Sequence, residues 1–308
     1  MRIGSIAQHS NITPTGPDSL PSFINAIPGR IGQLGKIWGW WDFTDIRALG
    51  GGSSDATTTT NLQLIDDKGP HDADASADAA SKGPKFNTTK LGQDNHHYVW
   101  AEPGQVDYMK FQNPTDLDIQ NFTAMIVMDF YGTTYDNDQV IFKIAGSSND
   151  FLQVYWETTY RNLTVHYKNS SGAEYAFTHK GYGLPNYTNA LTSQTGGDLN
   201  TNFNFIYIVG DGGSIKVYIR GHETEMKSIT MDPPGGDFPT GTLASGNVSY
   251  LLSNTQTNND DEQQIHAEMY EILMYSEALD SNQLKHLDWY MHKKYPTYPY
   301  SRLKQLGY

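Results

Sequence analysis

The chain contains no cysteine among its 308 residues. This absence excludes disulfide scaffolds, thiolate metal sites and cysteine nucleophiles together. It also argues against a eukaryotic secreted protein, in which a loop-rich β domain usually carries a bridge. A chain of this length buries about three quarters of its unfolded surface, so a stable core does not require such cross-links.

Long apolar runs are also missing. No stretch approaches the roughly 18 apolar residues that a membrane-spanning helix requires. Residues 1–10 have no basic start followed by an apolar segment, so we expect no signal peptide. The sequence therefore predicts a protein that does not insert into membranes.

Basic residues are scarce, with 21 Lys and Arg against 34 Asp and Glu, which gives a formal net charge of −13. A nucleic-acid backbone would be repelled by this charge, so we expect no nucleic-acid partner. Four aspartates in oxygen-rich loops are the candidate ligands for calcium, the hard cation that carboxylates prefer: Asp136, Asp138, Asp260 and Asp261. The pairs Asp66–Asp67 and Asp72–Asp74 have the same character, and none of these loops follows the EF-hand template. The alternative is that all of them are ordinary polar loop tips.

Residues 1–36 are predicted to form an extended arm, because four prolines recur there among Gly and Ser. Five apolar residues are the candidate anchoring contacts of this arm: Ile12, Leu20, Phe23, Ile24 and Ile27. A free disordered tail would be poorer in apolar residues, so we expect the arm to dock. It either packs along its own domain or grips a neighbouring subunit.

Short β-rich runs separated by turn residues follow the arm, starting with the aromatic segment 37–45. The later runs are 108–111, 122–130, 139–144, 151–156, 163–167, 175–177, 202–209, 214–219 and 248–252. Most of them alternate apolar and polar residues, as strands with one solvated face do. Glycine-rich residues 209–214 predict a tight hairpin. Segment 50–82 is poor in apolar residues, apart from the interruption Leu-Gln-Leu-Ile at 62–65, and predicts a long surface excursion. The pattern is typical of an all-β sandwich or barrel.

One helix is predicted near the C-terminus. Asp280 and Gln283 have the spacing of a capping box. Leu284, Leu287 and Met291 then share one face of the helix, and Pro296 ends it.

The segment 271–279, followed by a helix and then by Lys294 and Tyr295, resembles the closing segment of concanavalin A-like, laminin-G-type jelly-roll domains. The order of segments 38–42, 65–69, 83–86 and 106–111 resembles the bacterial and phage virion-protein branch of that lectin and glucanase superfamily. The resemblance spans about residues 37–296. It implies a two-sheet antiparallel jelly-roll sandwich over these residues, closed by one short C-terminal helix. The extended N-terminal arm (1–36) precedes this domain, and a C-terminal tail (297–308) follows it.

The superfamily includes glycanases, so the spacing of the carboxylates decides whether a glycosidase site is expected. Retaining enzymes of this fold use alternating acidic residues on one strand, which projects the carboxylates together into the cleft. No such triplet occurs in the chain. Glu268 and Glu271 are three apart, which on a regular strand predicts opposite faces. We therefore expect no enzymatic activity and no catalytic residue.

Sugar binding would need exposed aromatic rings beside polar side chains, because pyranose faces stack while hydroxyls need hydrogen-bond partners. The candidates are Tyr155, Trp156, Tyr160, Tyr182, Tyr187 and Asn258. The alternative is that Trp156 ends a core strand and that the tyrosines only pave one sheet face.

Two functions from different classes remain. The first is a non-enzymatic phage structural protein on the virion surface, for capsid decoration, as a head fibre or as a tail-associated protein. It would display a lectin-like domain, and its partners would be capsid or tail proteins, further copies of itself and a host surface glycan. The alternative is a free bacterial carbohydrate-binding module of a surface or secreted protein.

Overall fold

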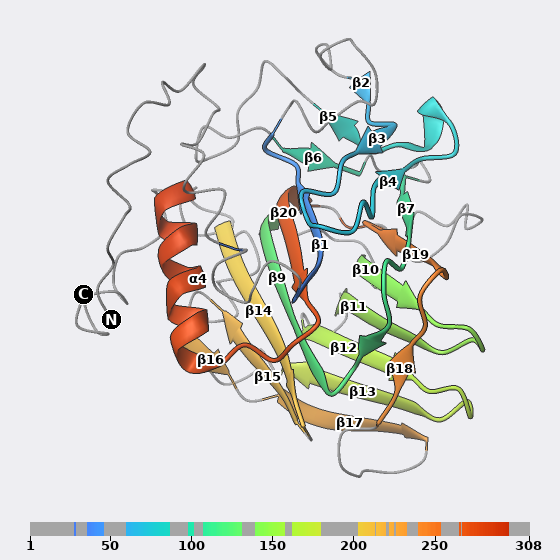
Figure 1. Cartoon of the computed structure of the whole chain (residues 1–308), viewed down its shortest axis with the longest axis vertical. Coiled ribbons are helices and arrows are strands. Elements are labelled where there is room, and N and C mark those ends of the chain that lie inside the picture. The colour runs from blue at the N-terminus through green and yellow to red at the C-terminus, as the bar shows by residue number, and fades with distance from the viewer. Residues whose placement is uncertain are drawn as a thin grey trace.

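The structure is a computed structural model. It describes residues 28, 36–45, 60–86, 98–101, 107–130, 139–157, 162–179, 203–212, 214–219, 222–224, 226–232, 240–253, 265 and 267–295. These residues form two nine-stranded antiparallel sheets, a small two-stranded ribbon and one α-helix (Figure 1). The expected all-β sandwich is therefore confirmed. The described part of the chain contains no helix with the length and hydropathy needed to cross a bilayer.

The first sheet, called sheet I, lies next to the helix. Eight of its strands follow in spatial order: β16 (His222–Thr224), β15 (Ser214–Ile219), β14 (Phe203–Asp211), β9 (Asn121–Phe130), β20 (Ala267–Tyr275), β6 (Val99–Trp100), β5 (Lys85–Phe86) and β2 (Thr60–Asn61). The ninth strand, β1 (Ile37–Asp42), pairs with β20. The predicted hairpin is confirmed, because Asp211 of β14 pairs with Ser214 of β15 across a two-residue turn.

The second sheet, called sheet II, lies across the sandwich from sheet I. Its order is β17 (Met226–Asp232), β13 (Glu174–His179), β12 (Asn162–Lys168), β11 (Phe151–Glu157), β10 (Gln139–Ala145), β19 (Val248–Leu251), β7 (Met109–Gln112), β4 (Ala75–Ser76) and β3 (Leu64–Ile65). Strands β8 (Leu117–Asp118) and β18 (Thr242–Leu243) form the separate ribbon.

Two hydrophobic cores divide the molecule into three layers. The main core lies between the sheets and takes the inward residues of both, such as Ile126 from β9 and Val165 from β12. Helix α4 (Ser281–Lys294) lies against the other face of sheet I (Figure 1). The second core lies between them and contains Tyr207 and Leu287. Sheet I is therefore buried on both faces, which explains why all nine residues of β20 are buried.

Helix α4 begins and ends as its sequence predicts. The Asp280 side chain accepts hydrogen bonds from the backbone amides of Asn282 and Gln283, and the Gln283 side chain accepts one from the Asp280 amide. This capping box satisfies amides that would otherwise lack partners at the first turn. Leu287 and Met291 face the second core, with Leu284 packed against it.

The predicted surface excursion at 50–82 is wrong at Ala73 and Ala75, which are as buried as the two ends of the apolar interruption at 62–65. Leu62, Ile65, Ala73 and Ala75 are at most 4% exposed and belong to the main core. Alanine adds little to a window of hydropathy, but it fills the narrow space between close-packed strands. Local polarity therefore underestimates how much of this segment is buried.

Candidate functional site

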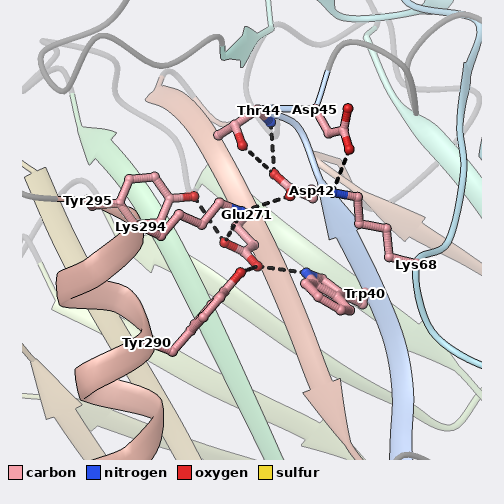
Figure 2. A network of polar contacts seen from close by, with 9 residues as sticks. All are labelled: Trp40, Asp42, Thr44, Asp45, Lys68, Glu271, Tyr290, Lys294 and Tyr295. Atoms are coloured by element: carbon pink, nitrogen blue, oxygen red, sulfur yellow. Dashed lines mark hydrogen bonds and ion pairs between the residues drawn. The ribbon is translucent and has the colours of Figure 1, made fainter. Parts of the chain in front are cut away.

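Glu271 lies at the centre of a buried polar network beneath helix α4 (Figure 2). Its Oε1 accepts hydrogen bonds from Trp40 Nε1 at 2.6 Å and from the Tyr290 hydroxyl at 2.9 Å. Its Oε2 accepts from Lys294 Nζ at 2.8 Å and from the Tyr295 hydroxyl at 3.0 Å. Four donors thus surround one carboxylate that is 0% exposed.

Two lysines extend the network to the second carboxylate, that of Asp42. Lys294 Nζ and Lys68 Nζ each lie 2.7 Å from Asp42 Oδ2, and Lys68 also pairs with Asp45 at 2.8 Å. Burial by itself would raise the pKa of Asp42, but the two lysines outweigh it and hold that pKa well below its usual range. Burial, together with the charges of Glu271 and Asp42, raises the pKa of Tyr290 and of Tyr295 well above the ordinary value.

This network joins β1, β20, the loop at Lys68 and the end of α4, so it holds the closing segment against the sandwich. The buried carboxylates of Asp42 and Glu271 accept hydrogen bonds from donors of the protein itself. A carboxylate that acts on a substrate must instead reach it in a cleft. The polar residues of the closing segment that carry the family resemblance are therefore engaged in contacts within the protein.

The expectation that Glu268 and Glu271 lie on opposite faces is wrong. The pairing of β20 with β9 shifts register between Met269 and Glu271, which marks a β-bulge. A bulge inserts one residue and reverses the alternation beyond it. Glu268 therefore shares the helix-side face with Glu271, and it accepts a hydrogen bond from the Tyr270 hydroxyl at 2.6 Å.

Two aspartates of the 66–74 loop accept hydrogen bonds from backbone amides. Asp67 accepts hydrogen bonds from the amides of Trp40, Gly69 and Ala73 at 2.7 to 3.0 Å, and Asp74 accepts one from the Asp67 amide. Within the described ranges, no group of three or more His, Cys, Asp or Glu side chains could hold a metal ion. The four calcium candidates, Asp136, Asp138, Asp260 and Asp261, lie outside the described residues.

The outer face of sheet II carries a different arrangement, in which five side chains form one line across five strands. Strand register places them directly opposite one another in the order Lys110 (β7), Tyr250 (β19), Lys143 (β10), Gln153 (β11) and His166 (β12). We call these five residues the cross-strand row. All five are partly exposed, whereas their inward neighbours Leu152, Val154 and Val165 belong to the main core.

Aromatic rings flank the His166 end of the row. The His166 ring meets the Phe151 ring edge-on at 5.0 Å and the Tyr155 ring at 6.3 Å between centroids. Its Nε2 lies 3.4 Å from Glu174 Oε2, and Glu174 Oε1 pairs with Lys168 at 2.7 Å. Burial lowers the pKa of His166 more than Glu174 raises it, and Lys143 and Lys168 lower it further. The imidazole is therefore neutral near pH 7.

The Lys110 end of the row borders a hollow of about 380 Å³. Its lining includes Asp72, Asp74, Ser76, Lys110, Gln112 and Val248, and Val248 is 40% exposed. Lys110 also pairs with Asp78. The row thus runs from a small polar hollow to a mixed aromatic and charged cluster, a combination that suits a ligand with both hydroxyls and apolar faces.

The structure separates the predicted sugar-binding residues. Tyr155 is partly exposed and lies beside His166. Trp156 is 3% exposed in the main core, as the alternative interpretation held, because successive residues of a strand face opposite sides. A ring buried in this way offers no face to a sugar, so Trp156 is corrected to a core residue. Tyr160, Tyr182, Tyr187 and Asn258 lie outside the described residues.

The arm is described at only a few positions. Its anchoring candidates Ile12, Leu20, Phe23, Ile24 and Ile27 lie outside the described residues. Pro28 is buried, and its carbonyl accepts a hydrogen bond from the Tyr275 hydroxyl at 3.1 Å. The Lys36 carbonyl accepts one from the Ser276 amide at 2.8 Å. At these two positions the arm contacts its own domain.

Sequence reasoning missed the cross-strand row. Lys143, Gln153 and His166 stand at the polar positions of three predicted strands, so the alternation already assigns them to a solvated face. The alternation does not predict the register of strand pairing, and it is this register that places the residues opposite one another.

Comparison with known proteins gives a likeness of structure only. No family profile and no curated protein sequence matches the chain. The binding domain of botulinum neurotoxin serotype D is 11% identical over 83% of this chain and 52% of its own, with a TM-score of 0.49. The binding domain of Paraclostridial Mosquitocidal Protein 1 is 11% identical over 75% and 51%, with a TM-score of 0.46.

A third similar structure is domain 4 of AbnA, an extracellular arabinanase from Geobacillus stearothermophilus, solved with arabinotriose. It is 17% identical over 82% of this chain and 98% of its own, with a TM-score of 0.43. The chain spans about half the length of the two toxin domains.

Proposed function

We propose that the protein is a non-enzymatic, lectin-like display domain that binds carbohydrate on the outer face of sheet II. The observation that carries this proposal is the cross-strand row, because it gathers hydroxyl, amide, imidazole and ammonium groups in one line beside aromatic rings. Sheet I offers no comparable face, since its described central strands are buried by the sandwich on one side and by α4 on the other.

The chemistry of sugars explains why such a face suits them. A pyranose presents apolar C–H patches, which pack on aromatic rings, and hydroxyls, which need partners that both donate and accept. Tyr155 and Phe151 supply rings, while Tyr250 and Gln153 supply groups that donate and accept. Rigid strands hold these groups in fixed register, which limits the entropy lost on binding.

A glycan array probed with the purified full chain tests the proposal. We expect binding to a subset of glycans and its loss or strong reduction in a Tyr155→Ala protein. Trp289→Ala is the matched control, because Trp289 is a 37% exposed aromatic residue on helix α4 and lies outside sheet II. Equal losses in both variants, or no glycan binding by the unchanged protein, would contradict the proposed site.

For the biological setting we propose display on a phage virion, with the arm 1–36 attaching the domain to capsid or tail proteins and the sandwich projecting as one of several copies. The acidic composition, the proline-rich apolar arm and the jelly-roll resemblance support this setting. Removing residues 1–27 spares the Pro28 and Lys36 contacts with the domain. We expect this truncated protein to remain folded but to lose occupancy on purified particles examined by electron microscopy. Full occupancy would contradict the role of the arm, and absence from particles of the unchanged protein would favour a free carbohydrate-binding module.

A further inference from the structure

The central part of the cross-strand row has polar groups that form no hydrogen bond or ion pair with any side chain that the structure describes. Tyr250, Lys143 and Gln153 lie directly opposite one another on β19, β10 and β11. Within the described part of the chain, no side-chain hydrogen bond or ion pair engages the Tyr250 hydroxyl, the Lys143 ammonium or the Gln153 amide. The other charged groups nearby do have partners, because Lys110 pairs with Asp78 and Lys168 pairs with Glu174.

Among the lysines that the structure describes on this face, Lys143 is therefore the one whose ammonium forms no ion pair. Lys110 and Lys168 each form an ion pair, with Asp78 and Glu174, whereas Asp72 and Asp74 line the hollow at the far, Lys110 end of the row. The whole chain has a net charge of −13. The ammonium lies 4.7 Å from the centroid of the Phe151 ring, which fixes the long side chain over the sheet.

The electrostatics agree with this geometry. Burial and, secondarily, the nearby Lys168 lower the pKa of Lys143 below its ordinary value. A half-buried cation without a counter-ion is costly, and an anionic ligand would relieve that cost.

We propose that Tyr250, Lys143 and Gln153 form a subsite for the anionic group of an acidic glycan. The inference rests on the proposed function and specifies its ligand class. Lys143 binds the carboxylate or sulfate, while Tyr250 and Gln153 hydrogen-bond the neighbouring hydroxyls. Adjacent strands lie about 4.8 Å apart, so the three residues span about 10 Å, enough for one sugar ring with its substituents.

Three methyl glucosides that differ only at carbon 6 test the ligand class. The corresponding three methyl galactosides test the same substituents on the sugar with the opposite configuration at carbon 4. The neutral sugar, the uronate and the 6-sulfate are each titrated against the full chain and followed by NMR. We expect the acidic sugars to bind about tenfold or more tightly than the neutral one, because a hydrogen bond to a charged group carries that difference. The uronate and sulfate arms show which anion the subsite prefers.

Variants at Lys143 then identify the residue. Lys143→Met keeps the aliphatic stem over Phe151 and should remove the preference for acidic sugars, whereas Lys143→Arg should retain it. Lys216→Met is the matched control, since Lys216 is on β15 of sheet I and its loss changes the net charge equally. A preference that persists in Lys143→Met would overturn the assignment.

The unchanged protein provides a second measurement that does not depend on a variant folding. Lys143, Lys168 and Glu174 are the charged groups that act on His166. Neutralising Lys143 with a bound anion should raise the pKa of His166, which an NMR titration of the imidazole reports. No rise in the presence of an acidic sugar that binds would overturn the inference. Equal binding of acidic and neutral sugars would overturn it and leave the proposed function standing, whereas binding of no glycan on the array would overturn both.

Discussion

Replacing Lys294 with methionine is the sharpest test of the buried network. Lys294 Nζ lies 2.7 Å from Asp42 Oδ2 and 2.8 Å from Glu271 Oε2, and its side chain is 1% exposed. Methionine has a similar length and preserves the packing of the stem, so the change removes the charge and little else. Asp42 keeps Lys68, whereas Glu271 keeps only the neutral donors Trp40, Tyr290 and Tyr295.

The expected cost follows from the charge that is left behind. Each charge-assisted hydrogen bond contributes about 1.5–3 kcal/mol, and breaking a buried ion pair from one side costs about 3–5 kcal/mol. We therefore expect Lys294→Met to lower the free energy of unfolding by about 3–5 kcal/mol, a large part of the roughly 5–15 kcal/mol that stabilises a typical protein. Urea unfolding followed by both fluorescence and circular dichroism measures it.

Lys216→Met is the control, because Lys216 and Asp211 form an exposed pair on sheet I. We expect this control to change stability by about 0–1 kcal/mol. A double mutant with Glu271→Gln should cost less than the sum of the single changes, since removing the carboxylate charge relieves the missing cation. A Lys294→Met protein within about 1 kcal/mol of the unchanged one, or strict additivity, would refute the reasoning.

Two further predictions concern the helix cap and pH. Asp280→Ala removes the acceptor of the Asn282 and Gln283 amides and should lower the free energy of unfolding by about 1 kcal/mol, as measured with urea. Ser281→Ala is the control, because Ser281 is an exposed neighbour and its replacement should change that free energy little. Equal stability of the two variants would contradict the role of the cap. The pKa of His166 is lowered from 6.5 in the folded protein, so the unfolded chain takes up the proton first as pH falls. The contribution of His166 is therefore complete above pH 6.5 and is lost as pH falls through the lower folded pKa. We expect stability to decline more steeply from pH 7 to 5 in the unchanged protein than in His166→Gln, and parallel profiles would exclude His166 as a cause.

The sequence predicts much of the fold because its signals are local. Alternation along a strand depends on neighbouring residues, so each of the nine later runs corresponds to a strand of the structure within about two residues at either end. The capping box depends on Asp280 and Gln283 alone, and the helix begins where they predict. The segment 222–232, which contributes β16 and β17, lacks a strong alternation and was not predicted.

For the candidate site, too, the sequence predicts the local features and not the long-range pairing. The sequence offers both Tyr155 and Trp156 as sugar-binding candidates, although neighbouring residues of one strand face opposite sides. The structure shows that Tyr155 is the partly exposed one and that Trp156 belongs to the main core. The sequence does not show that Tyr250 lies opposite Lys143, because these residues are more than one hundred positions apart and meet only through the pairing of β19 with β10.

By itself, the sequence determined the all-β class, the closing helix and the lack of any cysteine chemistry, since each follows from composition or from residues within a few positions of one another. Only the tertiary structure decided the faces and the partners. The bulge in β20 turned Glu268 and Glu271 to the same side, and strand register brought five distant residues into one row. Register and bulges are set by long-range pairing and packing, and a one-residue shift moves a side chain to the opposite face of a sheet.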